Sequence, residues 1–239
     1  MNSKSLHKLD WIKLRQNKLA FFSFCYILLA IFIAIFVVLI SPDSTPNANE
    51  MHVELANSKP LTKVVFLEIP RDYQQEISFF RSLLFGIPSK YKRIPIHDYR
   101  ILDGGLEYSV HGTNELKIYR GTYTISTQTF WFGTDKYGRD FLSRIIYGIR
   151  VSLSVGFISV FISLLLGITL GLLAGYFRGK VDDLIMWFVN VIWSIPTLLM
   201  VIAITLALGK GFWQVFVAIG LTMWVEVARV VRGQVLIVR

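Results

Sequence analysis

The chain has 239 residues, of which 54% are apolar and 17% charged, and its mean hydropathy is +0.53. These values exclude an ordinary soluble domain and indicate a membrane protein. The net charge of +9 does not indicate nucleic-acid binding, because residues 41–130 carry ten basic and ten acidic side chains and the excess of basic residues flanks apolar segments.

Four segments are long enough to cross a bilayer, for which a helix needs about 20 apolar residues. They are residues 19–40, 151–177, 184–208 and 212–237, and only the last contains charges. The first could be a signal peptide, but its uncharged run exceeds an h-region of about 7–15 residues and no cleavage site follows. We interpret it as a retained helix and predict an α-helical polytopic membrane protein.

Basic residues set the expected orientation. Residues 1–19 carry five basic side chains and one acidic side chain, which predicts a cytoplasmic N-terminus over residues 1–18. Four spans would return the chain to the cytoplasm. The segment 41–131 is then an extracytoplasmic insert.

The insert starts with a polar linker, "SPDSTPNANE". A β-like run, "KVVFLEI", an amphipathic helix candidate over residues 72–87, and the two β-type runs "RILDGGLEYSV" and "ELKIYRGTYTI" follow. We predict a small α+β domain. His52, His97 and His111 lack metal-ligand spacing, and the single Cys25 excludes a disulfide, so no metal site is expected.

The stretch "FGTDKYGRDFLSRIIYGIRVS" crowds charges against the second apolar segment. Its apolar residues recur at helical spacing, which predicts an amphipathic interfacial helix over residues 132–150. Thr134 is the expected N-cap, and Asp135–Arg139 and Asp140–Arg144 are expected ion pairs four residues apart. The alternative is a generic amphipathic segment leading into the span.

Small residues recur every four positions in the second span, and the pattern includes two overlapping G-x-x-x-G motifs. Such a ridge lets another helix backbone approach closely. Because four residues turn a helix by about 400°, different neighbours could meet its two ends. The expected helix-packing residues are Ser159, Ser163, Gly167, Gly171 and Gly175.

The third span contains Pro196, which cannot donate to the carbonyl of Ile192, so a kink is expected there. Asn190 and Ser194 could satisfy freed backbone groups or face a polar cavity. The sequence leaves open whether this is an ordinary kinked helix or a lining of a transport pathway.

The fourth span carries Glu226, Arg229 and Arg232 near its expected cytoplasmic end. Glu226 and Arg229 are expected to pair. Their depth favours interfacial anchoring and subunit packing over substrate contact. No phosphate-binding loop, G-x-S-x-G, H-E-x-x-H or C-x-x-C motif occurs, so nothing predicts an enzyme or a nucleotide site of this chain's own.

The segments "FGTDKYGRDFLSRIIYGIRVSLSVG", "GLLAGYFRGKVDDLIM", "SIPTLLM" and "WVEVARVVRGQVL" resemble the C-type inner-membrane permease of the dipeptide/oligopeptide/nickel family of ABC importers. The resemblance covers residues 131–239 closely and 1–40 loosely. Its most specific pattern falls on Gly133, Thr134, Asp135, Gly138, Arg139, Asp140, Ser143 and Arg144.

This resemblance implies a six-helix permease in the bacterial cytoplasmic membrane that lines half of a pathway for di- or oligopeptides. The implied partners are a second permease subunit, two cytoplasmic ATPases that bind the ATP, and an extracytoplasmic solute-binding protein; no cofactor is expected in this chain. It also suggests that the interfacial helix lies on the outer membrane face and caps the bundle. Our hypothesis is that Asp135, Arg139, Asp140 and Arg144 fix this helix against the bundle or its partner.

Two departures from the family remain. The chain stops at Arg239, before the E-A-A-type loop that docks on the ATPase and before two further helices, so we expect a truncated permease core. The insert of about 90 residues is longer than in many relatives. Alternatives are a permease for nickel or another small solute, an ion-coupled transporter or channel, and a membrane-anchored protein that does not transport.

Overall fold

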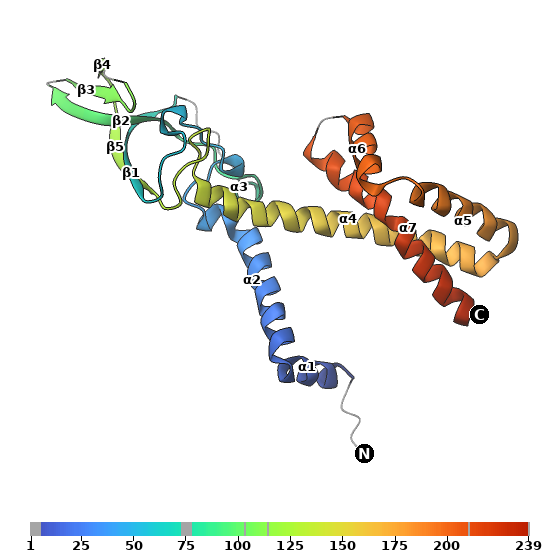
Figure 1. Ribbon diagram of the computed structural model, residues 1–239. Coiled ribbons are helices and arrows are strands. Elements are labelled where there is room, and N and C mark those ends of the chain that lie inside the picture. The colour runs from blue at the N-terminus through green and yellow to red at the C-terminus, as the bar shows by residue number, and fades with distance from the viewer. Residues whose placement is uncertain (1–5, 73–77, 103, 114, 210, 239) are drawn as a thin grey trace. The chain divides into compact units, whose positions relative to one another are not determined.

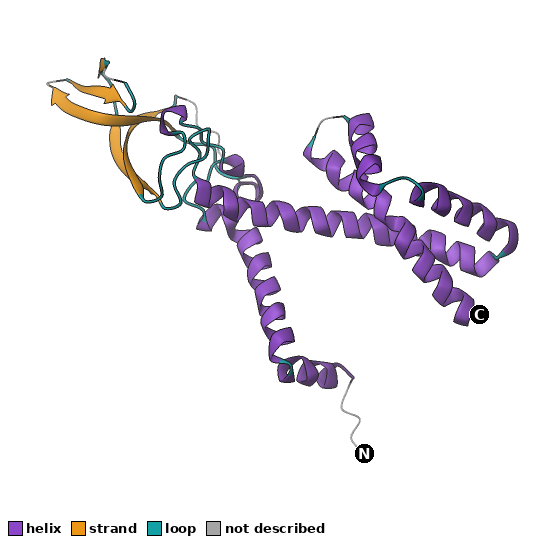
Figure 2. Cartoon of the chain, viewed as in Figure 1, coloured by secondary structure: helices purple, strands orange, loops and turns teal. Residues whose placement is uncertain are grey.

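Figure 1 shows the computed structural model of the chain, which describes residues 6–72, 78–102, 104–113, 115–209 and 211–238. The chain divides into two compact units, Met1–Arg150 and Val151–Arg239, which are described one at a time. All strands among the described residues belong to the first unit, as the colouring by secondary structure shows (Figure 2).

The first unit begins with α1 (Leu6–Gln16) and the apolar α2 (Lys18–Ile40). Asn17 caps α2, because its side-chain oxygen accepts a hydrogen bond of 3.2 Å from the amide of Ala20. The helix is kinked at Phe36, whose backbone angles are not helical. Its bounds agree with the predicted first span to within one residue. Two short 3₁₀ turns follow, η1 (Pro46–Ala48) and η2 (Val53–Leu55).

The insert contains a five-stranded antiparallel sheet in the order β4-β3-β2-β1-β5, so its α+β character is confirmed. Because successive strand residues face opposite sides, Phe66 packs with Leu55 and Phe130 on one face, while Leu67 packs with Ile96 on the other. The strands are β1 (Thr62–Pro70), β2 (Tyr91–Leu102), β3 (Gly105–Val110), β4 (Leu116–Tyr119) and β5 (Thr124–Phe130).

Helix α3 (Phe79–Phe85) connects β1 to β2 and has seven residues. The helix predicted over residues 72–87 is therefore shorter in its described part, and residues 73–77 of that prediction lie outside the described residues. Strand β2 starts at Tyr91, well before the β-type run expected from Arg100. Ile94 and Ile96 face the sheet core although Pro95 interrupts the β pattern between them.

The second unit contains most of α4 (Phe141–Phe177), then α5 (Gly179–Trp193), α6 (Thr197–Leu208) and α7 (Phe212–Val238). Among the described residues, three helices are long and apolar enough to cross a membrane: α2, α4 and the segment Trp213–Val238 of α7. The pair α5–α6, bent by 95°, is the fourth candidate span. The polytopic helical architecture expected from the sequence is thus present.

Two predicted boundaries are wrong. Residues 132–140 are not helical, and α4 runs without interruption from Phe141 to Phe177, so no separate helix ends at residue 150. The physical reason is that no glycine, proline or capping side chain stands at 150–151 to stop the helix. The third span is not one kinked helix but two helices separated by a sharp break.

Candidate functional site

The loop 132–140 is organised around the carboxylate of Asp135. Its Oδ1 accepts hydrogen bonds from the backbone amides of Tyr137 and Arg139, at 2.8 and 3.1 Å, and its Oδ2 lies 2.6 Å from the Arg139 guanidinium. The predicted Asp135–Arg139 ion pair is present, in a tight loop rather than on a helix. Burial favours the neutral acid, but these bonds to Arg139 and Tyr137 outweigh it and hold the pKa of Asp135 below its usual value.

Thr134 is not the N-cap of a helix. Its Oγ1 donates to the carbonyl of Leu55 and accepts from the amide of Ser58 at 2.9 Å, which joins the loop to the preceding linker. The cap of α4 is Asp140, whose Oδ2 accepts from the amide of Ser143 at 2.8 Å and from its hydroxyl.

The expected Asp140–Arg144 pair is absent from the described residues: Oδ2 of Asp140 caps the helix, and its Oδ1 is buried without a hydrogen-bond partner. The Nε of Arg144 instead lies 3.9 Å from Oδ2 of Asp135, and its side chain is 39% exposed. Arg144 is therefore a peripheral member of this group.

Two glycines of the motif permit close backbone approach. Gly138 has φ +72°, and a Cβ at this position would overlap the carbonyl oxygen of His52. Gly133 has φ +74°, and a Cβ there would overlap the carbonyl oxygen of Ser58. Both features require glycine, since a side chain would meet steric strain and a backbone clash.

Ser143 connects α4 to the linker after α2. Its Oγ, completely buried, accepts a hydrogen bond of 2.9 Å from the amide of Asp43. Asp43 in turn orders the linker, because its carboxylate accepts from the amides of Thr45 and Glu50. The motif residues thus fix the exit of α2, the linker and the start of α4 to one another.

A small pocket of about 10 Å³ lies beside this junction, lined by Glu50, His52, Arg93 and Asp140 among others. This volume suits one water molecule. The Nε2 of His52 and Oδ1 of Asp140 are buried and have no hydrogen-bond partner among the described residues. Burial favours the neutral form of Glu50, but His52 and Arg93 outweigh it and lower the pKa of this carboxyl.

Arg150, a half-buried residue that joins α2 to α3, was not identified from the sequence. Its guanidinium donates to the carbonyls of Ala34 and Ile35 in α2 and of Leu83 and Leu84 in α3, over 2.6 to 3.0 Å. A single arginine directly before an apolar run was the available signal. Its partners could not be read from the sequence because they are main-chain atoms 66 to 116 positions away.

In the second unit, the small-residue ridge of α4 faces α7. The three glycines lie against Val227, Val231 and Val235 of α7, and a Cβ at any of them would come within 2.5 to 2.9 Å of those valines' Cβ atoms. At the other end of the ridge Ser159 and Ser163 are buried, and the hydroxyl of Ser159 donates to the carbonyl of Phe216 at 3.1 Å. One neighbour thus covers Ser159 and all three glycines, so different neighbours at the two ends are not observed.

The break between α5 and α6 places Asn190, Ser194 and Pro196 together. The Ser194 hydroxyl and amide both donate to the carbonyl of Asn190, at 2.8 and 3.0 Å. The carbonyl of Ile192 is not left free, because the amide of Ile195 donates to it at 3.2 Å. Pro196 forms the N-terminal cap position of α6, and Asn190, Ser194 and Pro196 are all exposed.

The charged residues of α7 have other partners than expected. Glu226 is exposed and makes no ion pair with Arg229 within the described part of the chain. Arg229 lies over the ring of Trp193, 3.8 Å from its centroid, and Arg232 binds Asp182 through two bonds of 2.5 and 2.6 Å. The sequence did not identify Asp182 as the partner of Arg232, because the two residues lie 50 positions apart.

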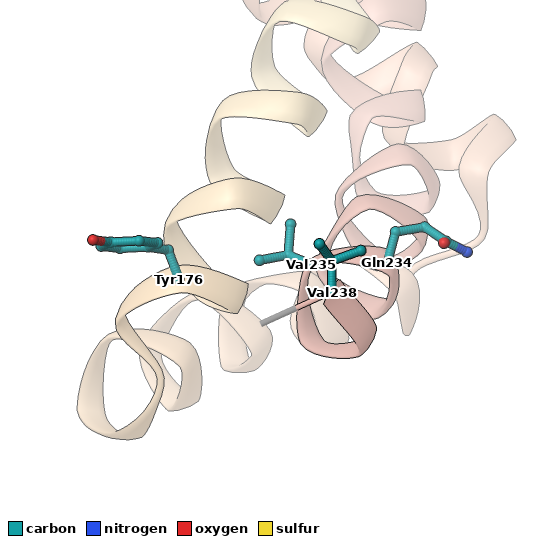
Figure 3. A pocket seen from close by; sticks show the side chains of 4 residues that line it. All are labelled: Tyr176, Gln234, Val235 and Val238. Carbon is teal, nitrogen blue, oxygen red and sulfur yellow. The ribbon is translucent and has the colours of Figure 1, made fainter.

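An apolar groove of about 350 Å³ lies between the last turns of α4 and α7. It is lined by Tyr176, Gln234, Val235 and Val238 (Figure 3). Val235 points toward α4, whereas Gln234 points away from it. This groove offers apolar contact area but no charged group for catalysis.

Two family models match the chain. One, described as "binding-protein-dependent transport system inner membrane component", matches residues 167–239, and the other, described as "N-terminal TM domain of oligopeptide transport permease C", matches residues 5–60. The first covers the ridge glycines and the α5–α6 break. The second covers α2 and the linker up to Lys59 and Pro60.

Named relatives agree with these matches. The chain is 43% identical over 106 residues to the dipeptide transport system permease protein DppC of Bacillus subtilis, which is 44% of this chain and 33% of that protein. It is 40% identical to the oligopeptide transport system permease protein OppC of the same organism, over 44% of this chain and 35% of the relative. For OppC of Escherichia coli the identity is 46% over the same shares. The chain therefore spans about a third of the length of these relatives.

Proposed function

We propose that this chain, which belongs to the C-type permease subunits of peptide ABC importers, forms half of a transmembrane pathway for di- or oligopeptides. Relatives named for dipeptide and oligopeptide transport support the substrate class. The description of the matched family as binding-protein-dependent supports a solute-binding protein as a partner.

The observation that carries the proposal is the break between α5 and α6. Residues 194–196 interrupt an apolar segment with backbone that belongs to neither helix, and all three residues are exposed. In a bilayer such backbone is tolerated only where it lines a water-filled cavity or is buried in protein, because lipid offers no hydrogen bonds. A pathway wall, completed by a second permease subunit, supplies that environment.

The remaining partners follow from the same family membership. Two cytoplasmic ATPases would bind ATP and drive the cycle, since the sequence has no phosphate-binding loop. Basic residues in 1–19 favour a cytoplasmic N-terminus and an extracytoplasmic insert, which would then stand on the side where a solute-binding protein docks. We place the protein in the bacterial cytoplasmic membrane as a multi-pass subunit.

Uptake of labelled dipeptide tests the proposal, in cells that lack other peptide importers and express the full reading frame with its candidate partner subunits. Ser194→Trp is expected to lower uptake by roughly tenfold or more, equal to about 1.4 kcal/mol. Thr169→Trp is the matched control, because Thr169 is also exposed and also bonds only to its own helix. Equal uptake by both variants would contradict a pathway role for the break.

Two further outcomes concern the alternatives. Uptake of nickel but not of peptide would replace the substrate class and keep the permease role. A protein that reaches the membrane, supports no uptake and does not co-purify with ATPase subunits would favour the membrane-anchored, non-transporting reading.

A further inference from the structure

Helix α3 carries an apolar surface that the other described residues of the first unit leave exposed. Phe79, Phe80, Leu84 and Phe85 are 63 to 75% exposed, although α3 has only seven residues. Large side chains at such exposure are costly in water, at about 25 cal/mol for each Å² of apolar surface. A surface of this kind marks a site that meets an apolar partner.

The Arg150 guanidinium sets the position of α3 along α2. It binds the carbonyls of Ala34 and Ile35 in α2 and, at the same time, those of Leu83 and Leu84. Carbonyls in the last turn of a helix lack helical partners, so the end of α3 is a natural acceptor for a cation. The last turn of α3 therefore lies at the level of residues 34–35.

This level lies inside the span formed by α2. Ala34 precedes the last helical residue, Ile40, by six positions, which is at most about 9 Å along the axis because α2 is kinked between them at Phe36. Since α2 has 23 residues and is about 34 Å long, it exceeds the hydrocarbon thickness of about 30 Å only slightly. Leu83 and Leu84 thus lie several ångströms below the membrane surface on the insert's side.

Other contacts hold α3 at this depth. Gly86 ends the helix with φ +85°, and a Cβ there would lie 2.8 Å from the backbone of Pro46. The amide of Ile87 donates to the carbonyl of Ser44 at 2.8 Å. The linker after α2 therefore contacts the end of α3 and holds it next to α2.

We propose that α3 is a membrane-embedded helix whose exposed apolar face lies among the lipid chains of the leaflet on the insert's side. Its partner is lipid rather than protein because α2 packs beside α3 and also exposes apolar side chains at this level of the bilayer, including Ile35 at 48%. Arg81, exposed on α3, reaches the headgroup region with its long side chain. Arg150 serves as the latch, since the main-chain carbonyls it binds provide the partners that a guanidinium needs at this depth.

Site-specific fluorescence quenching in lipid nanodiscs tests the proposal. Cys25, the single cysteine, is replaced in Cys25→Ser, and Phe80→Cys is labelled with an environment-sensitive dye. We expect quenching by lipids that carry a nitroxide near the headgroup and several-fold weaker quenching by aqueous iodide. Ile118→Cys on β4, where the native residue is 58% exposed, is the matched control and should show the reverse.

Each other outcome overturns the proposal. If iodide quenches the label at position 80 as strongly as that at 118, α3 faces water. If neither quencher reaches position 80, protein covers the helix instead of lipid. The measurement requires no transport activity, so its result is independent of the proposed function.

A second variant tests the latch. In Arg150→Lys a single ammonium group replaces the guanidinium that donates to carbonyls of both α2 and α3. A compact ammonium cannot reproduce the planar arrangement of donors in a guanidinium. We expect the label at position 80 to become accessible to iodide in this variant and to stay protected in Arg144→Lys. If position 80 stays protected in both, Arg150 does not hold the helix, and the latch is overturned. Should Arg150→Lys not fold, the label in the protein with native Arg150 still decides the lipid contact.

Discussion

Asp182 and Arg232 form a two-bond ion pair that joins the first turn of α5 to the last turns of α7, with Nε–Oδ1 and Nη2–Oδ2 distances of 2.5 and 2.6 Å. Asp182 is buried, and the side chain of Arg232 is 29% exposed. Parallel bonds of this kind fix both distance and orientation. This pair, rather than the expected Glu226–Arg229 pair, secures the end of α7.

Removing one partner should destabilise the second unit. For Arg232→Ala we expect a loss of about 2 kcal/mol, below the roughly 3–5 kcal/mol typical of fully buried pairs because Arg232 keeps some solvent contact. Thermal unfolding of the purified protein measures it. Lys180→Ala is the control, since Lys180 is exposed in the same helix, and it should change stability little. An equal effect of both variants would argue against the pair.

A methyl group added to the ridge should weaken the α4–α7 contact. In Gly171→Ala the new Cβ would lie 2.6 Å from the carbonyl oxygen of Ala228 and 2.9 Å from Cβ of Val231. We expect a loss of about 1–3 kcal/mol, as for other overpacked contacts. Gly156→Ala, in the same helix, meets no atom within 4 Å and should be neutral or slightly stabilising. The thermal midpoints of the two variants are compared.

Replacing a glycine by alanine can destabilise the fold in two ways: through backbone strain at a positive φ, and through overlap of the new Cβ with a neighbouring atom. Gly112, in the turn after β3 and outside the motif, has φ +84°, and a Cβ there would meet no atom within 4 Å. Gly112→Ala should therefore cost about 1–2 kcal/mol from backbone strain alone. Gly138→Ala adds an overlap with the carbonyl of His52 and should cost clearly more. Hydrogen exchange of the sheet amides gives both values. Similar costs would mean that the backbone around His52 relaxes readily.

The Asp140 cap should matter more than the neighbouring Arg144. We expect Asp140→Ala to cost about 1–2 kcal/mol, because the amide of Ser143 loses its acceptor. Arg144→Ala should cost about 0–1 kcal/mol, since its long contact to Asp135 is solvent-exposed. Urea unfolding of both variants tests the order, and the reverse order would contradict the assignment of the cap.

The contribution of Asp135 should depend on pH in a defined direction. Its folded-state pKa lies below the usual 3.8, so the stabilisation is complete well above pH 3.8 and is lost as the pH falls through the lowered value. The stability difference between the unaltered protein and Asp135→Asn should therefore be constant near neutrality and shrink below about pH 4. Unfolding midpoints from pH 7 to 3 measure it. A difference that grows on acidification would refute the sign.

Local features of the sequence determined much of this protein. The uncharged run 19–40 corresponds to α2, the four-residue spacing of small residues placed the face of α4 that meets α7, and Pro196 marked the break before α6. Each is an effect of neighbouring residues: hydrophobic length, helical periodicity and a missing amide. For the same reason the α+β nature of the insert could be read from alternation and turn residues.

Only the tertiary structure decided which groups meet. Asp140 rather than Thr134 caps α4 because Thr134 is already bound to Leu55 and Ser58. Arg150 joins α2 to α3, and Arg232 finds Asp182 fifty positions away. Periodicity reports the face on which a side chain lies, whereas a pairing between distant residues depends on how the chain brings two faces together, which no local pattern contains.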